Sequence, residues 1–263
     1  MLAEDVRLEI ENGIATIKID RGDGRNAVRP QTLSEICDAV DDAACAPEVR
    51  AIILTGEGKH FSAGGEFSFL EDLTHTPAPR IRDQIYTAFQ GAAKRIWNCP
   101  KPTLAAVNGA AVTVGCELSL ACDFRIASDK AVFQESWVKL GILPPLGGLY
   151  LLPHMVGLGR AAEIALTGRP VPAQEALAIG LVQRVVAADT LGSQAQEWAA
   201  ELAALPPLAY RAIKEGLHRG MESSMEKEWA TNVLAQAMLL GTDDFKEGLA
   251  SVTERRAGVF NGR

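Results

Sequence analysis

Residues 56–66 read GEGKHFSAGGE, and a second small-residue stretch, AVNG at 106–109, leads to VGCEL at 114–118. Each stretch follows an apolar run of strand length, and its small side chains let a ligand approach the main chain. Two such turns can direct backbone N–H groups at one oxygen atom, which is the arrangement of an oxyanion hole. Glu117 lies one helical turn after Val114 and is a candidate acid or base beside these donors. The two stretches therefore favour an enzyme.

The composition is that of an ordinary globular chain with an acidic balance. The 263 residues include 26 Lys and Arg against 33 Asp and Glu, which gives a formal net charge of −7. This length can bury a full core as one domain with an appendage. An acidic chain is a poor partner for nucleic acid, and a polyanionic ligand needs a local basic cluster. No run approaches the roughly 18 apolar residues that span a bilayer, so we expect no membrane segment.

The cysteines and histidines indicate a reducing compartment and no metal site. Five cysteines are odd in number and form no Cys-x-x-Cys pair, which favours reduced thiols. The first residues, Met1 to Asp5, are acidic and lack the charged-then-apolar layout of a signal peptide. The four histidines are scattered without metal-ligand spacing. We therefore expect a cytoplasmic protein without a bound metal.

The pattern along the chain predicts an α/β core followed by helices. Asn12-Gly13 between two apolar runs predicts a hairpin of strands 6–11 and 14–20. Pro30 suits the first turn of a helix, and Pro100 ends another that spans 80–97. The remaining expectations are strands at 49–54, 103–107, 123–127, 131–137 and 181–186, a short helix at 114–121, and a loop at 67–79. We divide the chain into a core, 1–191, and a helical C-terminal portion, 192–263.

The ordered motifs of this chain resemble those of the enoyl-CoA hydratase/isomerase (crotonase) superfamily. The resemblance extends over nearly the whole chain, and the matching stretches are 25–27, 61–64, 106–109, 115–118, 140–142, 147–148, 166–168, 180–182 and 245–248. It implies a spiral of strand-strand-helix units with C-terminal helices that pack on the core or on a neighbouring copy. It also implies an acyl-CoA substrate without a further cofactor, and a homotrimer or dimer of trimers.

The resemblance assigns roles to the residues of the two small-residue turns. The backbone N–H groups of Gly65 and Val114 are expected to hold the thioester oxygen, and Glu117 to act as acid or base. Val114 also opens a helix, whose free N–H groups and dipole favour an anion there. The alternatives are two ordinary glycine-rich connections and a capping or surface glutamate. A phosphate-binding loop fits less well, because residues 56–59 complete no such motif.

The chain departs from the hydratase pattern at Trp137. Hydratases of the family usually carry a second glutamate at this position, whereas moving a double bond needs only one group that removes and returns a proton. Trp137 is expected either to shape the acyl pocket or to fill core. Glu135 lies two residues earlier and would face the same side of a strand, so it is a candidate second acid or base. The alternative for Glu135 is a surface or capping role.

Coenzyme A is a polyanion, and its expected contacts follow from the resemblance. Arg25 is expected near the phosphates, and the backbone around Ala63 and Gly64 near the adenine. Arg255 matches a position that reaches coenzyme A, often on the neighbouring subunit, or else belongs to an exposed basic helix end. The segment 67–79 and the helix after it are expected to wall the acyl site. The apolar candidates for this wall are Phe67, Phe69, Leu70, Leu73, Ile85, Tyr86 and Phe89.

The function that these residues predict is chemistry on an acyl-CoA thioester. The main expectation is an enoyl-CoA hydratase, and the alternative from the missing second glutamate is a double-bond isomerase that uses Glu117 alone. A non-catalytic member that binds coenzyme A is a second class. A serine hydrolase is a third, although no histidine is placed to activate Ser62 or Ser119.

Overall fold

The computed structural model describes residues 4–263 and contains two sheets. Residues 1–3 of the acidic start lie outside the described residues. The larger sheet has six strands in the order β1-β2-β3-β4-β6-β9, and only β1 and β2 pair antiparallel. Its strands are β1 (Val6–Glu11), β2 (Ile14–Ile19), β3 (Ala51–Gly56), β4 (Thr103–Val107), β6 (Phe124–Ser128) and β9 (Arg184–Val186). The hairpin about Asn12-Gly13 is confirmed, and both turn residues have positive φ.

The smaller sheet has three short strands and carries the second turn. They are β5 (Ala110–Val112), β7 (Val132–Gln134) and β8 (Val171–Pro172), with β5 and β7 parallel. An isolated bridge between Ser62 and Ala111 attaches the first small-residue turn to β5. The two small-residue turns are thereby joined through this sheet.

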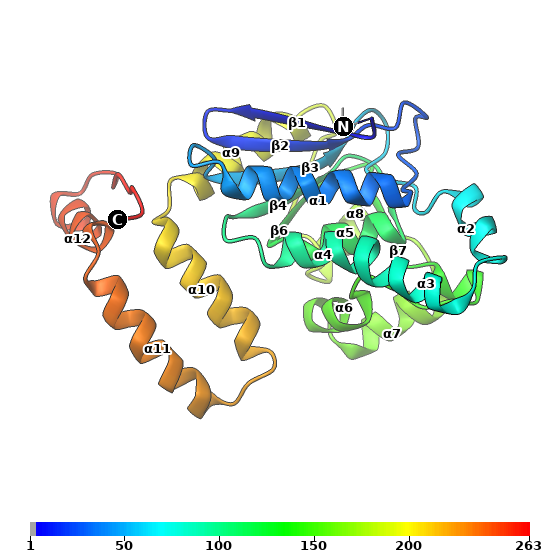
Figure 1. The fold of residues 1–263 in the computed structure, drawn as a ribbon. Coiled ribbons are helices and arrows are strands. Elements are labelled where there is room, and N and C mark those ends of the chain that lie inside the picture. The colour runs from blue at the N-terminus through cyan, green and yellow to red at the C-terminus, as the bar shows by residue number, and fades with distance from the viewer. Residues whose placement is uncertain (1–3) are drawn as a thin grey trace.

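Helices cover both faces of the larger sheet (Figure 1). On one face, α1 (Pro30–Cys45) packs against β1 and β2 and against α4 (Gln90–Trp97), and Pro30 is its first residue as predicted. On the other face, α9 (Leu191–Ala203) packs against β2, β3, β4 and β6. Inward residues such as Ile17 and Ile53 therefore belong to two separate apolar clusters, one on each side of the sheet.

The segment between the first turn and β4 is more helical than predicted. The loop expected over 67–79 is wrong for its first half, where α2 (Phe67–Leu73) forms. The helix expected over 80–97 is interrupted by a π-helical turn, η1 (Ile85–Phe89), between α3 (Ala78–Gln84) and α4. Such π-turns insert one residue into a helix and occur frequently at functional sites.

Two predicted strands are too long. The strand expected over 131–137 ends at Gln134, because its partner β5 has only three residues, and Trp137 begins a 3₁₀ helix, η2 (Trp137–Leu140). The strand expected over 181–186 includes only Arg184–Val186, because the N–H groups of Leu181 and Val182 bond to the carbonyl of Ala176. That carbonyl belongs to α8 (Ala173–Ala178). The short helix α5 (Val114–Ala121) is confirmed.

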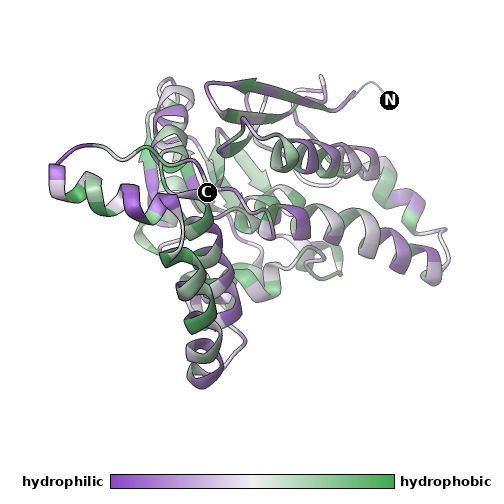
Figure 2. Cartoon of the chain, turned by 60° about the vertical axis from the view of Figure 1, so that its left-hand side comes forward, coloured by the Kyte–Doolittle hydropathy of each residue, from purple (hydrophilic) through white to green (hydrophobic). Residues whose placement is uncertain are grey.

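The C-terminal part of the chain is helical. After α6 (Gly148–Val156) and α7 (Leu158–Thr167), the chain returns to the core and then extends away from it through α10 (Pro207–Gly220), α11 (Met225–Leu240) and α12 (Asp243–Glu254) (Figure 1). Lys214 of α10 forms a 2.8 Å ion pair with Asp123 of the core. Figure 2 shows apolar residues along these helices. The division at residue 192 stays a prediction, and α9 on its C-terminal side packs on the core sheet.

No helix within residues 4–263 is long and apolar enough to cross a membrane.

Candidate active site

The two small-residue turns are in direct contact. The Ser62 N–H donates to the carbonyl of Ala110 (2.9 Å), and the Val112 N–H donates to the carbonyl of Ser62 (3.0 Å). A side chain at Gly115 would place its Cβ 2.7 Å from that of Ser62, and one at Gly64 would collide with the Thr113 hydroxyl. The glycines therefore permit a close approach that larger residues would prevent.

Among the described residues, the N–H groups of Gly65 and Val114 take no part in the backbone hydrogen bonds that their neighbours form. The Gly64 carbonyl and the Glu66 N–H both bond to Val28, so the intervening Gly65 N–H points to the opposite side of this extended segment. Val114 is the first residue of α5, where an N–H has no partner within the helix. Within residues 4–263 neither N–H donates a hydrogen bond. Their convergence on one oxygen stays a prediction.

Backbone strain lies directly beside these donors. Thr113, which precedes Val114, has a φ of 47° and a ψ of −109°. A non-glycine residue in such a conformation costs on the order of 1–3 kcal/mol and occurs preferentially at functional sites. The Thr113 N–H donates to the Gln134 carbonyl (2.7 Å), which holds the strained residue against β7.

Glu117 is buried and its carboxylate accepts three hydrogen bonds. Oε1 accepts from Trp137 Nε1 (3.0 Å), and Oε2 accepts from the N–H groups of Leu146 (3.0 Å) and Gly148 (2.6 Å). Burial raises the pKa of Glu117 to about 7, against the lowering effect of these donors. Both protonation states are therefore populated near neutral pH, as suits a general acid or base.

Glu135 is equally buried but has no partner. Both of its carboxyl oxygens lack a hydrogen bond among the described residues. Burial, and then the charge of Glu117, raise the pKa of Glu135 well above its ordinary value. Glu135 and Trp137 were predicted to lie on one strand, which is wrong because β7 ends at Gln134. The structure nevertheless brings both residues to Glu117 from beyond the strand.

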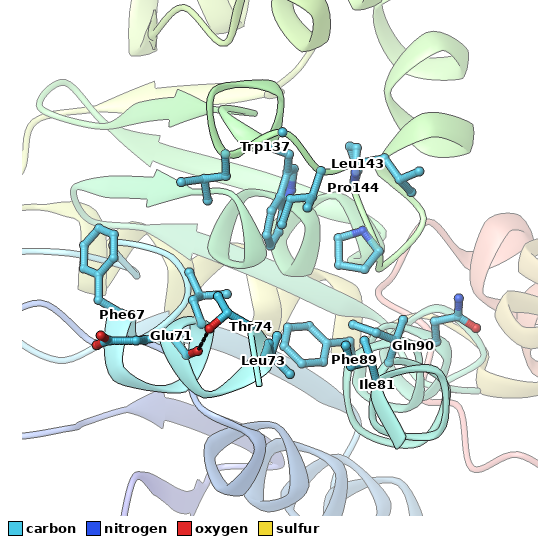
Figure 3. Close-up of a pocket in the computed structure, with 16 residues that line it drawn as sticks. Phe67, Glu71, Leu73, Thr74, Ile81, Phe89, Gln90, Trp137, Leu143 and Pro144 are labelled. Carbon is cyan, nitrogen blue, oxygen red and sulfur yellow. Dashed lines mark hydrogen bonds between the residues drawn. The ribbon is translucent and has the colours of Figure 1, made fainter. Parts of the chain in front are cut away.

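A cavity of about 960 Å³ opens beside Trp137. Figure 3 shows its two walls, with Trp137, Leu143 and Pro144 on one side and labelled residues of α2, α3, η1 and α4 on the other. Because Trp137 lines the cavity and also bonds Glu117, the cavity reaches the immediate surroundings of the carboxylate. Among the wall residues predicted from the sequence, five line it: Phe67, Leu70, Leu73, Ile85 and Phe89.

Sequence reasoning missed the wall formed by residues 140–145 and the two amides that hold Glu117. Leu140 to Pro145 line the cavity after η2. The Gly147-Gly148 pair was the sequence signal for these amides. Glycine is needed there because a Cβ at position 148 would lie 2.9 Å from Oε2 of Glu117. Phe69 and Tyr86, which were predicted as wall residues, are not among the residues that line the cavity.

The contacts expected with coenzyme A stay a prediction, and the residues named for them do not all lie together in this chain. Arg25 is exposed next to the first turn, and its carbonyl accepts from the Ala63 N–H (2.9 Å). The Asn26 amide holds the same turn through the carbonyls of Glu57 (2.9 Å) and His60 (2.7 Å). Arg255 ends α12, which lies at the opposite end of the molecule from α2 and α3 (Figure 1).

The buried Glu117 carboxyl group lies on the helix that begins at Val114, and an apolar cavity opens beside its hydrogen-bond partner Trp137. A model of the enoyl-CoA hydratase/isomerase family matches residues 9–263. The chain is 35% identical to a crotonyl-CoA hydratase of Syntrophomonas wolfei, with 99% of each chain covered, and 34% identical to a short-chain-enoyl-CoA hydratase of Clostridium acetobutylicum, with 97% of each covered. The crystal structure of an enoyl-CoA hydratase from Bacillus anthracis superposes with a TM-score of 0.91 at 31% identity, over 98% of this chain and 100% of that one. The chain belongs to the enoyl-CoA hydratase/isomerase family, and the crotonase fold expected from its sequence is confirmed.

Proposed function

We propose that this protein is an enoyl-CoA hydratase, which adds water across the 2,3-double bond of an acyl-CoA thioester. The observation that carries the proposal is the buried Glu117 carboxyl group, with a pKa raised to about 7, on the helix that begins at Val114. The hydratase names of full-length relatives at 34–35% identity support the same reaction.

The backbone donors supply electrostatic stabilisation. Attack of water on the β-carbon moves negative charge onto the thioester oxygen, and the N–H groups of Gly65 and Val114 are suited to hold it. Removing one such donor typically costs about 3–4 kcal/mol of barrier. Since both donors are backbone groups, most side-chain substitutions leave them in place.

Glu117 moves a proton in this proposal, either from the attacking water or to the α-carbon. Its three donors fix the carboxylate in one orientation, which general acid–base catalysis requires. The thioester itself activates the acyl group, so the proposed reaction uses no separate cofactor.

Coenzyme A recognition is assigned to the exposed face of the first turn. Arg25 is suited to the phosphates, and the backbone of Ala63 and Gly64 to the adenine. Arg255 would reach coenzyme A only from a neighbouring copy, because α12 extends away from the core of its own chain.

A homotrimer or a dimer of trimers is the proposed assembly. The helices α10, α11 and α12 expose many large apolar side chains, which is typical of an interaction surface. They include Ile213, Leu217, Trp229, Val233, Leu234, Met238, Phe245, Leu249 and Val252. Light scattering should give three or six times the chain mass of 28.1 kDa. The five free cysteines, four of them buried, fit the proposed cytoplasmic location.

A double-bond isomerase is the second candidate. The observation in its favour is Trp137, which stands where hydratases of the family usually carry a second glutamate and instead donates a hydrogen bond to the first. One carboxylate that removes and returns a proton suffices for isomerisation.

The deciding experiment incubates the protein with crotonyl-CoA, with longer 2-enoyl-CoA thioesters and with a 3-enoyl-CoA. Hydration removes the conjugated absorbance of the 2-enoyl substrates, whereas isomerisation of the 3-enoyl substrate creates it. Glu117→Gln should remain folded and lose turnover. Conversion of the 3-enoyl substrate alone would favour the isomerase, and coenzyme A binding without any turnover would indicate a non-catalytic member.

A further inference from the structure

Glu135 is a buried carboxyl group that has no part in the hydration step described for Glu117 and the backbone donors. It is 1% exposed, and neither of its oxygens has a hydrogen-bond partner among the described residues. A buried carboxylate is strongly disfavoured in its ionised form unless a cation or hydrogen-bond donor stabilises it, so such a group takes up a proton. A neutral carboxyl group has an O–H to donate, which a carboxylate lacks.

Glu117, in contrast to Glu135, is surrounded by hydrogen-bond donors. Its oxygens accept from Trp137 Nε1 and from the N–H groups of Leu146 and Gly148 at 2.6–3.0 Å. Donors of this kind stabilise the ionised form of a carboxyl group. The two carboxyl groups therefore share one site but differ in their hydrogen bonding, and such a difference assigns one of a pair as the acid and the other as the base.

The backbone fixes Glu135 next to this site. Its predecessor Gln134 accepts the Thr113 N–H (2.7 Å), immediately before the helix that carries Glu117. The titratable groups that face Glu135 are the Cys116 thiol and the Glu117 carboxylate, both on α5, and the Trp137 indole faces it from η2. The acidic charge of Glu117 further favours the neutral form of Glu135, because two adjacent carboxylates do not ionise together easily.

We propose that Glu135 is the proton donor of the hydration reaction, acting as a neutral acid opposite the Glu117 base. This assignment rests on the proposed hydratase function. Glu135 thereby supplies from two residues upstream the second carboxyl group that Trp137 does not provide.

The proton balance of the step is complete without a further reactant. The Glu117 carboxylate takes one proton from water as the hydroxyl oxygen bonds to the β-carbon. The electron pair of the double bond moves toward the thioester, and the α-carbon takes the proton of Glu135. Glu117 is then neutral and Glu135 ionised, and transfer of one proton from Glu117 to Glu135 restores the starting state.

The test compares Glu135→Gln with Glu11→Gln, a carboxyl-to-amide control at an exposed strand end. Glu135→Gln should lower kcat for 2-enoyl-CoA hydration by about 10²–10⁴-fold. The wild-type pH profile should fall at high pH as Glu135 ionises, and the variant should lack this fall. Glu11→Gln should retain both the rate and the profile.

An infrared measurement tests the neutral state without relying on turnover. At pH 8, where Glu117 is mostly ionised, the wild type should show the carbonyl band of a protonated carboxylic acid, and Glu135→Gln should lack it. Absence of this band from the wild type would overturn the proposal even if the variant fails to fold.

The outcomes separate this assignment from the proposed function. If the wild type hydrates no 2-enoyl-CoA, the hydratase function itself is wrong. If the wild type is active and Glu135→Gln matches it, Glu135 is not the acid although the function stands. A slower variant with an unchanged high-pH fall would make Glu135 a structural residue and overturn the proposal.

Discussion

The indole Nε1 of Trp137 donates a 3.0 Å hydrogen bond to Oε1 of Glu117. Trp137 is 2% exposed and also lines the apolar cavity, so one side chain connects the cavity wall to the carboxylate. Trp137 therefore fixes the orientation of the Glu117 carboxylate and favours its ionised form.

Trp137→Phe tests this connection, because it removes the donor and keeps an aromatic ring. A hydrogen bond to a charged group contributes about 1.5–3 kcal/mol, which corresponds to roughly 1–2 pH units in the pKa of Glu117. The low-pH limb of kcat should therefore move to higher pH. A matched control is Trp198→Phe on α9, where the ring is buried in the apolar cluster on the other face of the larger sheet. An unmoved limb would show that the indole does not stabilise the carboxylate.

The raised pKa of Glu117 also predicts how stability depends on pH. Between its ordinary pKa near 4.5 and its folded pKa near 7, the folded chain binds more protons than the unfolded chain. The free energy of unfolding should therefore fall as pH rises through this window and level off above it. The shift corresponds to on the order of 3 kcal/mol. Denaturant unfolding of the wild type and Glu117→Gln from pH 4.5 to 7.5 measures it, and equal slopes for the two proteins would contradict it.

Local signals were sufficient for much of the fold. Asn12-Gly13 predicted the β1–β2 hairpin because a tight turn requires positive φ, and these two residues have it. Pro30 predicted the start of α1 for a similarly local reason. The strand over 131–137 was too long because strand length depends on the partner, and β5 pairs with only three residues of β7.

The sequence named Glu117 and the two turns as site candidates, but it did not indicate which groups surround Glu117. Glu117 lies three residues after Val114, and both turns carry small-residue patterns that can be recognised in the sequence. The donors to Glu117 come from positions 20, 29 and 31 residues later in the chain, where no local pattern indicates the contact. Glu135 was named from the sequence. Its burial without a hydrogen-bond partner among the described residues depends on how α5 and η2 pack, so only the structure shows that feature.

Gly148→Ala tests the fit around Glu117. The added Cβ would lie 2.9 Å from Oε2 and 3.1 Å from Cδ of Glu117, so the carboxylate must move away from its amide donor. We expect kcat to fall at least about tenfold, since misplacement by about 1 Å can cost roughly 100-fold. Gly159→Ala in α7 is the control, because nothing lies within 4 Å of the added Cβ and alanine favours a helix. Normal activity of Gly148→Ala would indicate that the carboxylate position is not critical.

The cavity predicts a preference for acyl chains longer than the four carbons of crotonyl-CoA. Its volume of about 960 Å³ is some thirty times the roughly 30 Å³ that one water occupies in the liquid, and most of its lining is apolar. Each further buried CH₂ group contributes about 0.8 kcal/mol, so kcat/KM should rise up to about fourfold per carbon until the cavity is filled. Measuring kcat/KM for 2-enoyl-CoA substrates of 4 to 12 carbons tests this. Leu143→Trp, which enlarges a wall residue, should reduce activity on the long substrates and spare crotonyl-CoA. A maximum at four carbons in the wild type would contradict the prediction, because it would show that the bound acyl chain does not extend along this cavity.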